Sequence, residues 1–149
     1  MTSEPDFWEV SWRVEDEAFE GLQARSIEQR YKPQETIFEQ GQAADSMYLV
    51  VEGYALALPK DPQTGEEQST SIIPAGQSFG ELGLLMGQPR SATVVAGTEL
   101  KVLKITLETV KALEESDPQV AATLYKKLAC TLAEQLIIQV AYLRRDSSK

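Results

Sequence analysis

The spacing of apolar residues changes from helical to strand-like near residue 31. Residues 15–25 place apolar side chains at helical spacing among acidic ones, which predicts an amphipathic helix. Beyond residue 31, short apolar runs alternate with turn residues, which is typical of strands and hairpins. The predicted strands are residues 36–38, 46–51, 54–58, 69–73, 92–96 and 100–105. Together with short strands near the turns they would make about eight, and such a number favours a closed or double-sheet antiparallel architecture.

The last third of the chain has a helical pattern. Thr106 is a candidate N-cap, and the Asp117-Pro118 pair is a second helix start signal. Apolar residues then recur every four positions at Leu124, Leu128, Leu132, Leu136 and Val140. Such a stripe indicates core packing first. Any exposed part of it would also support pairing with a second copy of the chain.

The N-terminus adds two tryptophans, Trp8 and Trp12, whose spacing would put them on one helical face. We favour packing against the domain over contact with a partner. We therefore divide the chain into an N-terminal helical segment, residues 1–30, and one domain, residues 31–149. In that domain the strands occupy about 31–105 and the C-terminal helices about 106–145.

Composition narrows the function classes. The 149 residues carry a net charge of −9, which argues against a nucleic-acid partner. There is no histidine, so His-based catalytic triads and His-rich metal sites are excluded. The single cysteine, Cys130, allows no intramolecular disulfide, lies in an apolar helical pattern and suggests the cytoplasm. No signal peptide or membrane span is indicated.

Residues 79–96 read F-G-E-L-G-L-L-M-G-Q-P-R-S-A-T-V-V-A, and we call them the cassette. Arg90 follows a tight loop, beside backbone N–H groups that Gly80 and Gly83 leave accessible. That combination is suited to holding a single phosphate. Glu81, nine residues before Arg90, would accept a hydrogen bond from the hydroxyl of an attached sugar.

The cassette resembles the phosphate-binding cassette of cyclic nucleotide-binding domains, which occur in kinase regulatory regions, ion channels and bacterial transcription activators. The family pattern F-G-E-[LI]-[AGSC]-L, a spacer and P-R-[STA]-A-[ST]-V is matched without a gap. The segments K-P-Q-E-T-I-F-E-Q-G and A-D-S-M-Y-L-V-V-E-G also fall in family order, and the likeness is strongest to bacterial domains. The resemblance implies a mainly β fold, an antiparallel β-roll (double-stranded β-helix or jelly roll) with an N-terminal helix and C-terminal lid helices.

The resemblance also implies roles for individual residues. Arg90 would bind the cyclic phosphate, and Glu81 would bind the ribose 2′-hydroxyl. Ser91 would bear on the choice between cAMP and cGMP, for which we expect cAMP. The full set of expected ligand-binding residues is Phe79, Gly80, Glu81, Leu82, Gly83, Arg90, Ser91 and Ala92.

A lid over the base is expected near Leu132, Gln135 and Leu136, although these residues depart from the Thr-Ser that matched bacterial activators offer at Gln135-Leu136. We expect a sensor that relays binding through movement of the last helix to an unknown effector or fused domain. It would need no cofactor or metal and would have no catalytic residue, since no nucleophile and base pair is present. The alternative is a structural or dimerisation domain of the same fold that no longer binds nucleotide.

Overall fold

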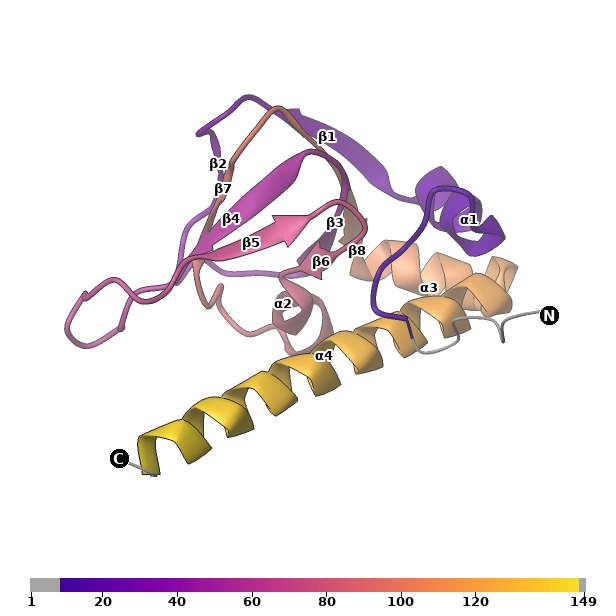
Figure 1. Ribbon diagram of the computed structural model, residues 1–149. Coiled ribbons are helices and arrows are strands. Elements are labelled where there is room, and N and C mark those ends of the chain that lie inside the picture. Colours follow the sequence, from indigo (N-terminus) through magenta and orange to yellow (C-terminus); the bar gives the residue numbers. More distant parts are fainter. Residues whose placement is uncertain (1–8, 148–149) are drawn as a thin grey trace.

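The computed structural model describes residues 9–147, which form a β-roll with helices before and after it (Figure 1). Two antiparallel four-stranded sheets make the roll, with strand orders β1-β8-β3-β6 and β2-β7-β4-β5. The strands are β1 Ile27–Tyr31, β2 Thr36–Phe38, β3 Ser46–Glu52, β4 Tyr54–Leu58, β5 Ser71–Pro74, β6 Ser78–Phe79, β7 Thr93–Ala96 and β8 Leu100–Thr106. The antiparallel β-roll expected from the sequence is confirmed.

Helix starts agree with the predicted caps. The helices are α1 Glu17–Arg25, α2 Glu81–Met86, α3 Leu107–Ser116 and α4 Pro118–Ser147. Thr106 Oγ1 accepts a hydrogen bond from the Thr109 N–H at 3.2 Å, which caps α3. Asp117 Oδ1 accepts one from the Val120 N–H at 3.4 Å, so Asp117-Pro118 does open α4.

The roll begins earlier in the chain than the sequence pattern indicated. Strand β1 starts at Ile27 and pairs with β8 from Ile27 opposite Lys104 to Tyr31 opposite Leu100. Ile27 is 50% exposed, and β1 lacks the alternation of buried and exposed side chains that identifies a strand. Pairing with the buried strand β8 determines the structure of these residues.

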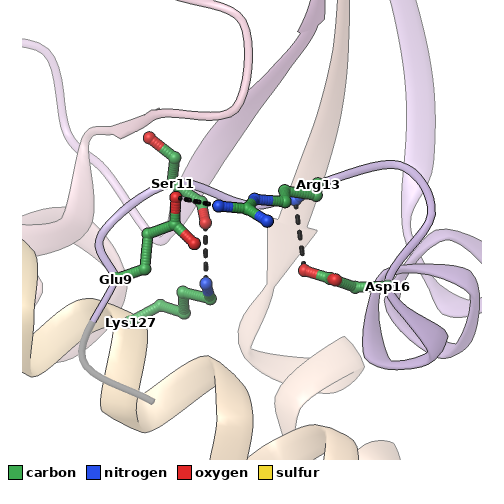
Figure 2. Close-up of polar contacts among 5 residues, drawn as sticks. All are labelled: Glu9, Ser11, Arg13, Asp16 and Lys127. Atoms are coloured by element: carbon green, nitrogen blue, oxygen red, sulfur yellow. Dashed lines mark hydrogen bonds and ion pairs between the residues drawn. The ribbon is translucent and has the colours of Figure 1, made fainter. Parts of the chain in front are cut away.

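The segment before α1 connects α4 to the roll. Lys127 Nζ, on α4, donates to the Ser11 carbonyl at 2.7 Å, and Arg13 pairs with Glu9 in the same segment (Figure 2). The Trp12 N–H donates to the Gly76 carbonyl at 2.7 Å. Trp12 is buried, so its expected packing role is confirmed, but it precedes α1 and is not helical. Trp8 lies outside the described residues.

Two clusters of buried side chains make the core. One lies between the helices and a sheet and includes Leu22, Met47, Leu103 and Leu124. The other fills the roll, and it includes Phe38, Tyr48, Phe79, Val50 and Val102. The second cluster lies under the cassette and supports its first residue, Phe79.

Helix α4 is core at its start and exposed at its end. Leu124 and Leu128 are buried, whereas Leu136 is 64% exposed and Val140 is 39% exposed. The core interpretation of the stripe is therefore wrong for the C-terminal half, because that half extends beyond the helices it packs against at its start (Figure 1). No described helix, α4 included, is long and apolar enough to cross a bilayer.

Candidate ligand-binding site

The cassette runs from the end of β6, through α2 and a loop, into β7. Gly80 forms the N-cap of α2 and Gly87 its C-cap, both in the left-handed region at φ 79° and φ 65°. Helix α2 packs against β3. The loop after α2 brings the Arg90 side chain back to the start of the helix, where it contacts Gly80.

Gly80 and Gly83 are needed for space around Arg90. A Cβ on Gly80 would lie 2.6 Å from Arg90 Nη1, and one on Gly83 would lie 2.8 Å from the same atom. Both distances are too short for a real Cβ, so a larger residue would displace the guanidinium or the backbone. The two glycines let the Arg90 side chain lie directly against main chain.

The Arg90 guanidinium is buried, with 7% of the residue exposed, and its partners are neutral. Nη1 donates to the Ser46 carbonyl at 2.7 Å and to the Gly80 carbonyl at 3.2 Å. Nη2 donates to Ser46 Oγ at 3.1 Å. Within residues 9–147, no carboxylate forms an ion pair with Arg90, so its positive charge is not neutralised by a direct partner.

Aromatic rings support this charge from beneath. Arg90 Cζ lies 4.1 Å from the centroid of the Phe38 ring and 5.7 Å from that of Tyr48. Tyr48 in turn stacks on Phe79 with centroids 5.2 Å apart.

Burial lowers the pKa of Arg90 from its ordinary value, while Tyr48, Asp45 and Glu81 act in the opposite direction. An arginine stays protonated in proteins, so the consequence is a buried, charged group.

Arg90 keeps hydrogen-bonding capacity for a ligand. A guanidinium has five N–H donors, and the bonds to Ser46 and Gly80 use three of them. The second Nη2 donor and the Nε donor have no partner among the described residues. Two adjacent donors on a planar cation suit a bidentate contact with phosphate or carboxylate.

The main chain on both sides of Arg90 is also paired. The Arg90 N–H donates to the Gln42 carbonyl at 2.9 Å, and the Gly41 N–H donates to the Arg90 carbonyl at 2.8 Å. The loop between β2 and β3 therefore holds the backbone of Arg90. A side chain anchored at both its backbone and its guanidinium loses little conformational entropy when a ligand binds.

Glu81 is the second buried charged residue of the cassette, with 6% of it exposed. Its Oε1 accepts a hydrogen bond from Ser78 Oγ at 2.7 Å. Glu81 acts on the pKa of Arg90 through its charge, but the two side chains form no ion pair. The site therefore presents a cation and an anion separately.

The other cassette residues expected to bind ligand differ in exposure. Phe79 and Gly83 are buried, Gly80 and Ala92 are half-buried, and Leu82 and Ser91 are exposed. Ser91 directly follows Arg90 at the surface. The structure thus brings Gly80, Gly83 and Arg90 into contact, with Phe79 packed in the aromatic cluster below.

The three expected lid residues lie on α4 and are more exposed than the start of that helix. Leu132 is half-buried, while Gln135 and Leu136 are exposed. In the part of the chain that the structure describes, no hydrogen bond or ion pair joins any of the three to the cassette. Their role as a lid stays a prediction.

Several residues that shape the site were not anticipated from the sequence. Phe38 and Ser46, which hold the guanidinium, come from β2 and β3, far from the cassette in the chain. No local pattern marks them, because β2 and β3 belong to different sheets and meet at Arg90 only in the folded roll. Ser78 is different, since a hydroxyl three residues before Glu81 is visible in the sequence.

The fold and the cassette are shared with known proteins. The family model of the cyclic nucleotide-binding domain matches residues 28–117. A cyclic nucleotide-gated potassium channel of Rhizobium etli is 36% identical over 91 residues, covering 60% of this chain and 23% of the channel. The cAMP-activated global transcriptional regulator CRP of Salmonella typhimurium is 34% identical over 101 residues, covering 67% of this chain and 48% of the regulator. The chain thus spans less than half of either relative.

A solved structure supports the same assignment. The catabolite activator protein of Thermus thermophilus superposes with a TM-score of 0.73 at 27% identity. The match covers 88% of this chain and 61% of that protein. It therefore includes the roll and much of the flanking helices.

Replacing Gly80 should disturb Arg90 more than replacing Gly87 does. Both Gly80→Ala and Gly87→Ala place alanine at positive φ, which costs about 1–2 kcal/mol each. Only the Gly80 Cβ meets Arg90, while nothing lies within 4 Å of the Gly87 one. Loss of a charged hydrogen bond should lower the free energy of unfolding of Gly80→Ala by about a further 1.5–3 kcal/mol, measured by urea denaturation. Equal losses in the two variants would contradict the close approach.

Proposed function

The chain belongs to the family of cyclic nucleotide-binding domains, and we propose that it is a regulatory module that binds cAMP in preference to cGMP. The observation that carries the proposal is the buried Arg90, whose charge has only neutral direct partners. Burial of an unpaired ion costs several kcal/mol, about as much as its hydrogen bonds and aromatic contacts return. An anionic ligand would supply the missing opposite charge.

The cyclic phosphate would bind at Arg90. The two unused N–H donors, Nε and one on Nη2, would contact phosphate oxygens as a fork. Gly80, Leu82 and Gly83 would contribute main-chain groups at the same place, because the glycines allow close approach. A single local cation can do this in a chain of net charge −9, since the ligand carries only one negative charge.

The ribose would bind at Glu81. This carboxylate already has one oxygen bonded to Ser78, and the other would accept the hydrogen bond of the 2′-hydroxyl. It has no water-activating partner, so its role is binding. We therefore propose that the module makes and breaks no bond in its ligand.

The base would lie near Ser91 and Ala92, with Phe79 in the supporting core. Ser91 after the arginine does not by itself decide between adenine and guanine. The proposed preference for cAMP follows the name of the CRP relative, a cAMP-activated regulator. Leu132, Gln135 and Leu136 are proposed to cover the base when α4 moves. An apolar contact and one amide would then replace the hydroxyl contacts of the bacterial activators.

The output would be a shift in the population of α4 positions. If ligand binds better to a form with α4 closed over the base, binding moves the exposed half of that helix relative to the roll. An effector protein, or a domain fused to this one, would read the change. We also propose a cytoplasmic location, as the single cysteine suggests.

The exposed half of α4 is further proposed to pair with the same helix of a second copy. Leu136 and Val140, about 40° apart at roughly 100° per residue, lie on one face, and both are exposed. An apolar stripe of this kind is self-complementary in a two-fold dimer. Loss of nucleotide binding with retention of this pairing is the alternative function, a dimerisation domain with a vestigial cassette.

Calorimetric titration with cAMP and then cGMP tests the proposal, on protein refolded from denaturant to remove carried-over ligand. We expect one-to-one binding, and the ratio of the two affinities decides the base preference. Arg90→Leu should lower the affinity at least tenfold, because a charged hydrogen bond contributes about 1.5–3 kcal/mol.

Arg30→Leu is the matched control for this arginine. Arg30 is exposed on β1, at the opposite edge of its sheet from β6. The Arg30→Leu variant should therefore bind cAMP with the affinity of the parent. A folded parent that binds neither nucleotide would favour the vestigial alternative. Parental affinity in the Arg90→Leu variant would instead show that the phosphate binds somewhere other than at Arg90.

Glu81→Gln should reduce affinity for cAMP by roughly threefold to tenfold, since one hydrogen bond to the 2′-hydroxyl is weakened. The same variant should bind 2′-deoxy-cAMP as tightly as the parent does. Glu115→Gln, at an exposed position of α3, serves as the control for charge alone. Equal losses toward both nucleotides would show that Glu81 does not read the ribose.

The double variant Leu136→Glu, Val140→Glu should not form the dimer, because its two charges per chain would have to be buried in the helix pair. Sedimentation velocity should find the parent at twice the mass of the chain and the double variant at the monomer mass. Ala141→Glu, about 140° around the helix from Leu136 at ~100° per residue, should stay dimeric. A monomeric parent would contradict the pairing.

A further inference from the structure

The partner of Glu81 lies in β6, just before the cassette turns into α2. Ser78 Oγ donates to Glu81 Oε1 at 2.7 Å, and among residues 9–147 no other side chain is hydrogen-bonded to this carboxylate. Because Glu81 is nearly buried, a carboxylate without a partner there would be costly. The serine therefore stabilises one orientation of the carboxylate.

Ser78 has a well-defined position because its strand is paired with β3. Ser78 lies opposite Leu49, and Phe79 lies opposite Tyr48. One residue earlier in the chain, the N–H of Val50, also on β3, donates to the Gln77 carbonyl at 2.9 Å. The hydroxyl thus projects from a main chain that is held by β3 at Gln77, Ser78 and Phe79, whereas Glu81 begins a helix of six residues.

The second carboxylate oxygen of Glu81 is open to a ligand. No fully buried side-chain nitrogen or oxygen in the described residues lacks a hydrogen-bond partner. Oε2 has no partner there, so it is not fully buried. With Oε1 bonded to Ser78, Oε2 is the carboxylate atom left without a partner among the described residues.

We infer that Ser78 is a positioning residue for ribose recognition, because it fixes Oε1 of Glu81 and so directs Oε2 to the 2′-hydroxyl. This inference rests on the proposed function and deepens it. Ser78 acts through Glu81 and contacts no part of the ligand. It should therefore influence the preference for ribose over 2′-deoxyribose and leave the phosphate contact at Arg90 unchanged.

Calorimetric titration of Ser78→Ala with cAMP and 2′-deoxy-cAMP tests this role. Affinity for cAMP should fall by roughly threefold to tenfold, the effect of one positioned hydrogen bond, while affinity for 2′-deoxy-cAMP stays at the parental value. Ser78→Thr keeps the hydroxyl and should restore most of the preference. Ser71→Ala, at an exposed serine of β5, is the matched control and should bind both nucleotides as the parent does.

The outcomes separate the inference from the proposed function. A parent that binds neither nucleotide overturns both. A parent that binds, with Ser78→Ala losing affinity equally toward the two nucleotides, overturns the role of Ser78 alone and assigns it to folding of the cassette. Unchanged affinity of Ser78→Ala for cAMP overturns it as well.

Discussion

The burial of the Arg90 charge against neutral groups constrains the rest of the site. Removing a guanidinium from water costs several kcal/mol, so each contact around it must return part of that cost. The contacts come from separate places in the chain: Ser46 on β3, Phe38 on β2 and the Gly80 carbonyl. The two sheets of the roll bring them together, and the glycines of the cassette leave room for the guanidinium.

The same arrangement keeps the positive charge of Arg90 apart from the negative charge of Glu81, so the two do not neutralise each other in an ion pair. Arg90 is held by Ser46 and the aromatic rings, and Glu81 is held by Ser78. Each charged side chain therefore has a local neutral partner and keeps an unused hydrogen-bonding atom. The proposed ligand, with an anionic group and a hydroxyl donor, would meet groups that are already ordered, which would lower the entropy cost of binding.

Helix α4 has two dissimilar halves. Its first half is core, with Leu124 and Leu128 buried and Lys127 bonded to the segment before α1. Its second half exposes apolar residues such as Leu136. This contrast between an anchored start and an exposed end is the basis for proposing that α4 relays ligand binding and pairs with a second copy of the chain.

The sequence by itself determined the β-roll, the two helix starts at Thr106 and Asp117-Pro118, and the cassette around Gly80, Glu81 and Arg90. Turn residues between apolar runs favoured a closed or double-sheet antiparallel architecture, and the resemblance carried by the contiguous cassette implied the β-roll. Capping side chains indicated the two helix starts. Only the tertiary structure decided what surrounds the charges, because Phe38 and Ser46 lie on different sheets that meet at Arg90 in the folded roll. It also decided that β1 starts at Ile27 and that the apolar stripe of α4 is core only to about Leu132, since burial depends on where a neighbouring element ends.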